Sequence, residues 1–325
     1  MKAIGGYFEL ADYEEGKGFP HQDGILLNTG RNALEYILRS IGDVKCIYLT
    51  YYTCEVVLEP LKKLHIPWTF YHINSSFEMV EDIQPKVGEY IIANNYFGIK
   101  DSYIKKLAEK YGDYLIVDCA QALFAIPITN IKMFYSTRKY VGVGDGGVAY
   151  LGHVRSGKVE VNGEDQTANH DKHLFTRKLF GAEAGFKEFQ ENEAKLNNQP
   201  IRWMSNTTKR ILDHIDYDKL IAIRRTNYSY LHDNLIKKNL LQLPDLDSFI
   251  CPMVYPLMTN IDQYLRKELI NNKIYVAKYW PNIEEWCSPD VLEYNLSQNL
   301  VCLPIDQRYN IREMDLILDM IARFV

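Results

Sequence analysis

The sequence predicts an α/β protein with a mostly parallel central sheet, helices flanking the sheet, and a small α+β domain at the C-terminus. In the first half of the chain, short apolar strands alternate with helical segments across short connections, which is typical of parallel sheets covered by helices. Long helical segments follow, and after Pro244 the chain alternates strands and helices again. We therefore expect an N-terminal arm and large domain over residues 1–215, and a long linking helix with the small domain over residues 216–325.

The chain begins with an irregular arm, residues 1–24, which we expect to pack on another part of the protein. A short buried strand, 25–27, leads into a helix that runs to about Ser40 and carries apolar residues at helical spacing. The later strands of this half are short runs rich in β-branched and aromatic side chains. They cover residues 46–49, 67–71, 90–93, 114–118 and 148–151, with a helix capped by Thr53 and a helix over 102–111 between them.

The second half begins with a charged and polar stretch, residues 153–172, which we expect at the surface. Long helical segments are predicted over roughly 173–197 and 205–240, and apolar residues of the second recur at approximately helical spacing. The small domain is then predicted from short apolar strands that alternate with helices. These are strands at 253–255, 274–276 and 300–303, and helices at 260–271 and 311–324.

The composition is that of an ordinary soluble globular protein, because 47% of the 325 residues are hydrophobic and 24% are charged. The net charge of −5 and the lack of basic clusters argue against a nucleic-acid surface. No apolar run approaches the ~18–20 residues that a membrane span needs. The six cysteines form no C-x-x-C pair, so we expect buried thiols, a reducing compartment and no metal site. With no signal peptide visible, we expect a cytoplasmic protein.

The stretch from Phe134 to Tyr150 holds small hydroxyl residues, two cations and four glycines between two predicted strands. Glycine lets a backbone turn sharply and approach a ligand closely. A lysine beside such a loop can be held against an electrophile, so we hypothesise that Lys139 forms an imine with pyridoxal phosphate (PLP). The simpler interpretation is a Gly-rich hairpin with an exposed lysine, and this stretch taken alone favours it.

Residues 142–147 also satisfy the dinucleotide-binding pattern G-x-G-x-x-G. That pattern has a mechanical meaning only after a strand and at the start of a helix. Here residues 148–151 are strand-like, and two adjacent glycines start a helix poorly. We therefore reject a dinucleotide site.

Polar side chains follow three of the predicted strands, namely Asn94 with Asn95, then Asp118, and then Ser136 with Lys139. In sheets of this kind, ligands bind at the carboxyl ends of the strands. Because these three strand ends converge on one edge of the sheet, we expect their side chains to form a site.

A second candidate lies at the start of the first helix, where Asn28, Thr29 and Gly30 form a small polar turn. Such a turn exposes free backbone N–H groups and the positive end of the helix dipole, which suits an anion. N-capping by Asn28 or Thr29 is the simpler interpretation, and the sequence alone favours it.

Four stretches occur in the order, and at about the spacing, of motifs in one enzyme family. They are TGRNAL at 29–34, VDCAQA at 117–122, S-x-x-K at 136–139 with GDGG at 144–147, and CLPI at 302–305. Through these motifs the whole chain resembles the DegT-type nucleotide-sugar aminotransferases, a group within the fold-type-I PLP-dependent enzymes. The second and third motifs are the specific ones, and the resemblance implies the fold-type-I architecture.

The resemblance also implies roles at PLP. Asp118 would pair with the ring nitrogen and keep it protonated, so that the ring accepts electrons when the substrate Cα proton leaves. Gln121 would contact the 3-hydroxyl group or pack over the ring. Lys139 would hold PLP as an imine and then move the proton as a general acid and base. A related group of dehydratases has His at this position, so Lys139 argues for transamination.

The implied phosphate site departs from the family pattern. Ser136 would donate to the PLP phosphate, while Gly30 and Arg31 would supply N–H groups and charge. Arg31 stands where the family usually has Thr. The family also uses an Asn of the second subunit here, but the matching segment, 199–205, lacks it, and Arg202 could replace it.

The aromatic contact to the PLP ring departs as well. The family usually stacks an aromatic side chain on the ring, but Cys54 falls at that position in this chain. We therefore expect Tyr51, Tyr52 or Tyr96 to stack on the ring. These departures leave PLP binding expected and place the sugar substrate in question.

We predict a PLP-dependent aminotransferase that works as a homodimer, with the active site at the subunit boundary. The resemblance implies transfer of an amino group from an amino acid, with glutamate expected, to a keto-sugar nucleotide in nucleotide-sugar biosynthesis for cell-surface polysaccharide. Arg308, Tyr7 and Tyr13 are candidate substrate contacts. Two alternatives stay open: a PLP enzyme for a small non-nucleotide compound, and a non-catalytic regulatory member of the fold. Asp118 and Lys139 argue against the second, because a scaffold needs neither.

Overall fold

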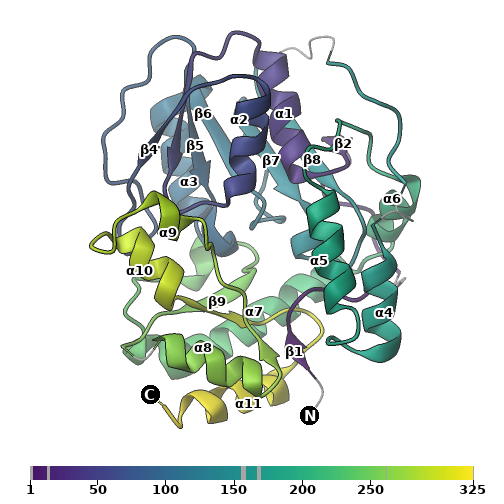
Figure 1. Ribbon diagram of the computed structural model, residues 1–325, viewed down its shortest axis with the longest axis vertical. Coiled ribbons are helices and arrows are strands. Elements are labelled where there is room, and N and C mark those ends of the chain that lie inside the picture. The colour runs from purple at the N-terminus through teal and green to yellow at the C-terminus, as the bar shows by residue number, and fades with distance from the viewer. Residues whose placement is uncertain (1–2, 13–14, 155–158, 167–169, 261, 325) are drawn as a thin grey trace.

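The computed structural model describes residues 3–12, 15–154, 159–166, 170–260 and 262–324. Figure 1 shows two parts stacked along the long axis of the molecule. The upper part contains the central sheet with its helices, and the lower part contains the C-terminal helices and short strands. The helices α4 (Lys172–Phe180), α5 (Phe186–Lys195) and α6 (Asn206–Asp213) lie on the right-hand side in this view.

The central sheet has seven strands in the order β2-β8-β7-β6-β5-β3-β4. The strands from β7 to β4 run parallel, whereas β8 and β2 at one edge are antiparallel to their neighbours. The mostly parallel sheet predicted from the sequence is therefore confirmed. Its strands are β2 (Ile25–Leu27), β3 (Cys46–Thr50), β4 (Trp68–Tyr71), β5 (Glu89–Asn94), β6 (Leu115–Cys119), β7 (Lys132–Ser136) and β8 (Gly147–Leu151).

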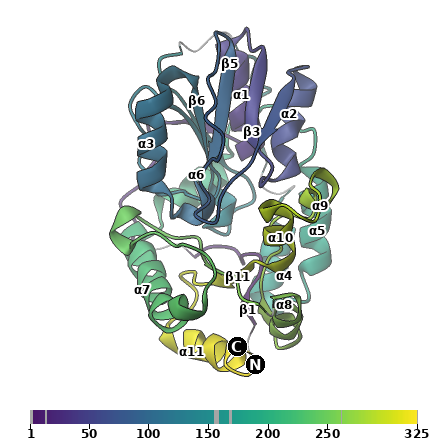
Figure 2. The same ribbon diagram turned by 90° about the vertical axis from the view of Figure 1, so that its left-hand side faces the viewer.

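Side chains along the strands alternate between two apolar cores. Val117 and Cys119 of β6 belong to the core that includes α3 (Asp101–Tyr111), whereas Ile116 belongs to the core under α1 (Gly30–Ile41) and α2 (Leu58–Lys63). Figure 2 shows α3 on one side of the sheet and α1 with α2 on the other. Because alternate residues of a strand point to opposite faces, Asp118 lies on the α1 side, as Ile116 does.

Over the described residues, four helices occupy the predicted helical segments 173–197 and 205–240, because each segment is interrupted. Gly181 ends the first of them with a φ of 94°, a conformation that glycine adopts readily and that terminates helices. Asp216 starts the last one by accepting a hydrogen bond from the backbone N–H of Lys219. The helices are α4 (Lys172–Phe180), α5 (Phe186–Lys195), α6 (Asn206–Asp213) and α7 (Tyr217–Leu235).

The C-terminal part holds two small sheets. In one, β9 pairs antiparallel with β11, and in the other, β1 of the N-terminal arm pairs parallel with β10. The arm thus packs on the C-terminal part, in line with the expectation for residues 1–24. The elements are β1 (Ile4–Gly5), β9 (Val254–Leu257), α8 (Asp262–Asn271), β10 (Ile274–Tyr275), α9 (Ile283–Trp286), α10 (Leu292–Asn299), β11 (Val301–Pro304) and α11 (Ile311–Ile321).

Two further expectations concern the chain as a whole. The division into domains at residue 215 stays a prediction, although α7 begins close to that point. Over the described residues, every helix is too short or too polar to span a lipid bilayer. The surface excursion predicted over 153–172 lies partly outside the described residues.

The glycine-rich loop between β7 and β8 is fastened to α6 by Asp145. The buried carboxylate accepts hydrogen bonds from the backbone N–H of Ser205 (2.8 Å), from the Ser205 hydroxyl (2.7 Å) and from the Thr208 hydroxyl. Burial raises the pKa of this carboxyl group, although the three donors act in the opposite direction. The loop is therefore held by a tertiary contact as well as by its own turn.

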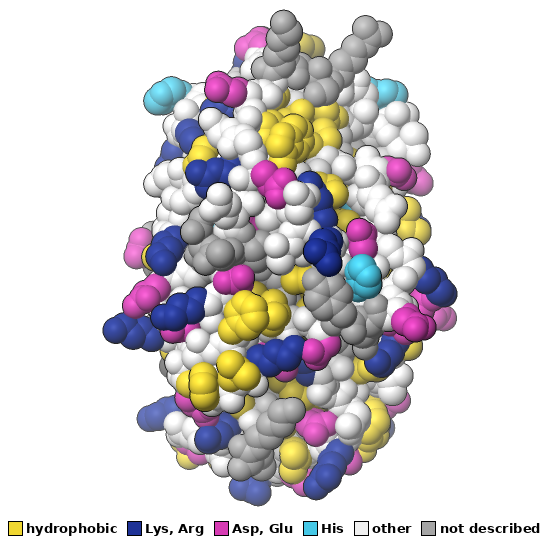
Figure 3. Space-filling view, turned by 90° about the vertical axis from the view of Figure 1, so that its right-hand side faces the viewer, with side chains coloured by type: hydrophobic (Ala, Val, Ile, Leu, Met, Phe, Trp, Pro, Cys, Tyr) yellow, Lys and Arg dark blue, Asp and Glu magenta, His cyan; other side chains and the backbone are white. Residues whose placement is uncertain are grey.

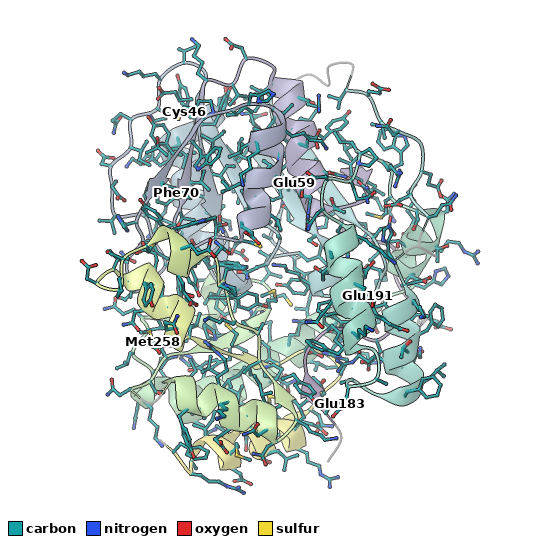
Figure 4. All side chains as sticks on the ribbon, viewed as in Figure 1. Cys46, Glu59, Phe70, Glu183, Glu191 and Met258 are labelled. Atoms are coloured by element: carbon teal, nitrogen blue, oxygen red, sulfur yellow. The ribbon has the colours of Figure 1, made fainter. Side chains whose placement is uncertain are left out.

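Asp145→Ala would leave these buried donors without an acceptor, so we expect it to lower the free energy of unfolding by about 2–4 kcal/mol. Asp145→Asn keeps one acceptor oxygen and should lose less. Urea unfolding at pH 7 measures both, with Glu191→Ala at an exposed position of α5 as the matched control (Figure 4). If Asp145→Ala is as stable as this control, the anchoring role is wrong.

Candidate active site

The polar strand ends predicted from the sequence meet in one pocket of about 240 Å³. It lies at the carboxyl ends of parallel strands, on the side of the sheet that α1 covers. Six of the predicted site residues line it, and the two predicted tyrosines do not. The six are Gly30, Arg31, Asp118, Gln121, Ser136 and Lys139. The structure therefore brings them together, while their roles at a cofactor stay predictions.

Asp118 is the buried carboxylate of this pocket. It stands near the end of β6, and one of its oxygens accepts a hydrogen bond of 2.8 Å from the backbone N–H of Ala120. Burial raises its pKa to about 6, although this hydrogen bond and the charge of Lys139 both favour the ionised form. A positively charged group inside the pocket would stabilise the carboxylate further.

Lys139 ends the short 3₁₀ turn Thr137–Lys139 that directly follows β7. Its ammonium lies 5.8 Å from the centre of the Tyr279 ring. Within the part of the chain that the structure describes, no carboxylate forms an ion pair with it. A partly buried lysine without a counter-ion is available to react with, or bind, a ligand in the pocket.

The glycine-rich loop returns the chain from Lys139 to β8. The Gly146 backbone N–H donates to the Asn28 carbonyl (2.6 Å), and any Cβ at Gly147 would lie 2.2 Å from the Thr29 carbonyl oxygen. Glycine is therefore required where the loop crosses the start of α1. Because β8 follows the loop and no helix does, the rejection of a dinucleotide site agrees with the structure.

The start of α1 forms the other end of the pocket. The Thr29 hydroxyl accepts a hydrogen bond from the backbone N–H of Asn32 (3.1 Å), so Thr29 does cap the helix. A Cβ at Gly30 would come within 3.4 Å of the Ser136 Cβ, which shows how closely helix and strand approach. The same turn lines the pocket beside the Ser136 hydroxyl, so it can both cap the helix and face an anion.

Two arginines flank this end, and the sequence analysis singled out one of them. The Arg31 guanidinium donates to Glu59 of α2 (2.9 Å; Figure 4) and to Asn197 (2.8 Å). Arg138, which the sequence analysis missed, pairs with Glu193 of α5. Although burial favours the neutral form of Glu193, the guanidinium of Arg138 lowers the pKa of that carboxyl group. Because Arg138 directly precedes Lys139, the S-x-x-K motif itself could have pointed to it.

Three buried polar atoms of residues that line the pocket have no partner among the described residues, Asn94 Oδ1, Gln121 Nε2 and Arg138 Nε. Gln121 Oε1 accepts from the backbone N–H of Phe97 (3.1 Å), so the amide nitrogen remains as a donor. Asn94 Nδ2 donates to the Thr53 hydroxyl (3.0 Å). The Thr53 hydroxyl therefore binds a side chain of the pocket. The prediction that Thr53 caps the next helix is wrong. Buried polar atoms without a protein partner leave a pocket with donors and acceptors for a ligand.

The tyrosines expected to stack on a PLP ring lie elsewhere, and this expectation is corrected. The Tyr51 ring stacks on Phe70 of β4, 4.6 Å between centres (Figure 4). Tyr52 and Tyr96 are buried in the core, where the Tyr96 hydroxyl donates to the Tyr52 carbonyl (2.7 Å) and the Tyr52 hydroxyl to the Tyr279 carbonyl (2.7 Å). None of the three lines the pocket, because each ring has packed against other aromatic residues.

Cys54 lines the pocket at the position where the resemblance places an aromatic residue. Burial raises the pKa of its thiol, while the nearby charge of Lys139 lowers it. Trp280 of the C-terminal part also lines the pocket. The sequence analysis missed Trp280, because nothing in its local sequence connects it with residues so far away along the chain.

A second, larger cavity of about 760 Å³ adjoins the first. The two share Ser136, Arg138, Lys139 and Glu193. The N-terminal arm, α4, α5 and the C-terminal strands form its wall. Most of the wall is apolar, and it includes Tyr7, which stacks on Phe189 with 4.8 Å between ring centres.

Charged and titratable side chains of the larger cavity are already paired or neutral. The Arg177 guanidinium donates to Glu9 (2.9 Å) and lies 4.7 Å from the centre of the Tyr7 ring. Burial lowers the pKa of His173 to about 4, so its imidazole is neutral at physiological pH. Lys139 is therefore the cation of this wall that lacks a partner among the described residues.

The remaining candidates lie outside the two cavities or outside the described residues. Arg308 pairs with Asp306 (2.7 Å) and Glu9 (3.0 Å) and fastens the N-terminal arm, so its predicted substrate contact is not supported by its position. Tyr13 lies outside the described residues. Arg202 bonds Gln199 (3.3 Å) within its own chain and does not line the pocket, and its role toward a second subunit stays a prediction.

Solved structures share this fold, although neither a family model nor a curated protein matches the sequence. A DegT DnrJ EryC1 StrS aminotransferase from Brucella abortus matches with a TM-score of 0.62 and 15% identity, over 93% of this chain and 85% of that one. The PLP form of Spr1654 from Streptococcus pneumoniae matches with a TM-score of 0.61 and 15% identity, over 91% and 85%. DesI, determined in the presence of its TDP-sugar product, matches with a TM-score of 0.60 and 12% identity, over 92% and 79%. The predicted fold-type-I architecture is therefore confirmed.

The raised pKa of Asp118 makes stability depend on pH. Because its pKa of about 6 lies above the ordinary value of 3.8, the folded state favours the protonated form. This contribution is present below about pH 4 and is lost as the pH rises through about 6, a change of about 3 kcal/mol. Asp118→Asn should remove it, so the variant should gain stability relative to the wild type between pH 4 and pH 7.

Urea unfolding of the cofactor-free protein across this pH range measures the effect. Asp23→Asn at an exposed position is the matched control and keeps the pH profile of the wild type. If Asp118→Asn also follows the wild-type profile, the carboxyl group is not held in an apolar environment.

Proposed function

We propose that this protein is a PLP-dependent aminotransferase. The observation that carries the proposal is that Lys139 and Asp118, an amine without a counter-ion and a buried carboxylate, line the same pocket of about 240 Å³. A lysine that forms an imine with PLP needs its amine free of ion pairs. A carboxylate that keeps a pyridine nitrogen protonated needs to be buried and close to it.

The residues of the pocket fit PLP. Asp118 would hold the ring nitrogen, whose positive charge would compensate the burial of the carboxylate. The unpaired Nε2 of Gln121 would donate to the 3-hydroxyl group of the ring. The N–H groups at the start of α1 and the Ser136 hydroxyl would bind the phosphate, with Arg138 and Arg31 beside them. Bound PLP would supply an electron sink for the substrate Cα carbanion.

Lys139 would then have two roles. It would hold the cofactor covalently through its Nζ until an amine substrate displaces it. Released in this way, its amine stays at the junction of the two cavities, where it can take the proton from the substrate Cα and return a proton to the adjacent carbon of the cofactor.

The larger cavity supports a keto-sugar nucleotide as the amino acceptor. Its volume of about 760 Å³ falls within the ~300–1,000 Å³ of sites that enclose ligands well above amino-acid size. Because Lys139 lines this cavity too, the reactive end of such a ligand would lie at the smaller pocket. DesI, which shares the fold, was determined with its TDP-sugar product. Glutamate as the amino donor rests on the resemblance of the motifs.

A homodimer is part of the proposal. Phe175, Leu179 and Phe180 of α4 and Phe186 of α5 are exposed. Figure 3 shows the side of the molecule that carries α4 and α5, where hydrophobic side chains lie among charged ones. Exposed apolar groups of this size often mark subunit contacts. A cytoplasmic location, expected from the sequence, completes the proposal, together with a place in nucleotide-sugar biosynthesis for cell-surface polysaccharide, which rests on the resemblance alone.

Reconstitution with PLP tests the cofactor. The wild-type protein should gain the visible absorption of a protonated imine, and Lys139→Ala should lose it because no other amine of the pocket can form the bond. Lys187→Ala at an exposed position of α5 is the matched control and keeps the band. A wild-type protein that stays colourless at saturating PLP would favour the regulatory scaffold.

Addition of substrates tests the reaction. Glutamate should bleach the visible band, because the amino group passes to the cofactor, and a keto-sugar nucleotide should restore it. If small keto compounds restore the band and sugar nucleotides do not, the alternative of a small non-nucleotide substrate is correct. Parallel spectra of Lys139→Ala, which should not respond to either addition, serve as the control.

A further inference from the structure

The segment between β10 and α9 carries an aromatic side chain from the C-terminal part into the smaller pocket. Trp280 is 7% exposed and lines this pocket together with Asp118, Lys139 and Cys54. Figure 1 shows α9 at the lower end of the central sheet, whereas β1, the strand with which the preceding β10 pairs, lies in the lower part. The segment thus bridges the two parts of the molecule at the pocket.

Hydrogen bonds from both parts hold this segment. The Tyr52 hydroxyl donates to the carbonyl of Tyr279 (2.7 Å), and Asn282 Nδ2 donates to the carbonyl of Thr53 (3.0 Å). On the other side, the Ser297 hydroxyl donates to the Trp280 carbonyl (3.1 Å). The backbone on either side of Trp280 is therefore tied to the strand end that leads to Cys54.

The indole ring itself is packed. It meets the Tyr52 ring at 62°, with 5.2 Å between centres, an edge-to-face arrangement that aromatic pairs favour. Tyr52 is fully buried, so this contact fixes one side of the indole ring against the core. Trp280 itself lines the pocket.

Cys54 leaves room for this ring. Its side chain is small, it lines the same pocket, and the charges of both Lys139 and Asp118 act on its thiol. Cys54 therefore shares the pocket with the two groups that are proposed to hold opposite ends of the cofactor. An aromatic residue at this position would occupy the space into which Trp280 reaches.

We infer that Trp280 supplies the aromatic contact to the ring of the cofactor, in place of a residue from the segment after β3. This inference rests on the proposed PLP function. It also means that the C-terminal part completes the cofactor pocket, so that cofactor binding joins the two parts of the chain. Trp280 is a binding and positioning residue, and it takes no part in proton transfer.

Titration of the cofactor-free protein with PLP, followed by the visible imine band, tests the inference. Trp280→Ala should weaken binding about tenfold, because an aromatic contact is lost. Trp280→Phe keeps a ring and should stay within about threefold of the wild type. Trp286→Phe is the matched control and should bind PLP as the wild type does. The Trp286 ring packs on Phe70 with 5.0 Å between ring centres, and Trp286 does not line the pocket.

A rescue variant separates a contact from a general loss of structure. The double variant Cys54→Phe/Trp280→Ala supplies an aromatic ring to the pocket from position 54 instead of position 280. Its affinity for PLP and the visible circular dichroism of the bound cofactor should therefore recover toward the wild type. Far-ultraviolet circular dichroism shows that each variant is folded.

The outcomes distinguish the two proposals. If the wild type forms the band and a folded Trp280→Ala binds PLP as tightly, or the rescue variant binds no better than Trp280→Ala, the role of Trp280 is wrong and the proposed function stands. If Trp280→Ala does not fold, a Trp280→Phe that binds tenfold more weakly overturns the inference. If neither the wild type nor any of the variants forms the band, the proposed function is wrong, and the inference about Trp280 is wrong with it.

Discussion

A buried carboxylate at the end of the central strand is the constraint on which the candidate site depends. Asp118 stands on β6, which is buried throughout its length, and the surrounding protein raises its pKa to about 6. An isolated charge in such a place is unfavourable unless a partner compensates it. The nearest positive charge is that of Lys139, and a single backbone N–H donates to the carboxylate. A positively charged ligand group that binds between Asp118 and Lys139 would stabilise the buried carboxylate.

The loop after β7 determines where the amine of Lys139 lies. Its turn needs glycine where it crosses the start of α1, and Asp145 ties its far end to α6. The same crossing brings the N-terminus of α1 next to Ser136. A single short segment therefore positions the amine, a hydroxyl group and the free N–H groups of a helix around one small volume, which is the arrangement that a phosphorylated aldehyde cofactor requires.

The larger cavity exists because the two parts of the chain meet beside this segment. The N-terminal arm pairs with the C-terminal β10, and Arg308 and Arg177 both bind Glu9 of the arm. These ion pairs hold the arm in place, so the charged side chains that form them have a structural role. The cavity beside them is mostly apolar, has a volume of about 760 Å³ and opens on the amine of Lys139.

The sequence by itself determined the parallel sheet, the strand ends and most of the pocket. Asp118, Ser136 and Lys139 were predictable because alternation of strands and helices implies a sheet whose carboxyl ends carry the ligand site, and glycines mark the loop. Only the tertiary structure decided which aromatic ring reaches the pocket. Tyr51, Tyr52 and Trp280 have similar local sequence character, and their positions depend on which other rings they pack against. Such packing joins residues that are far apart in the chain, and no local pattern contains it.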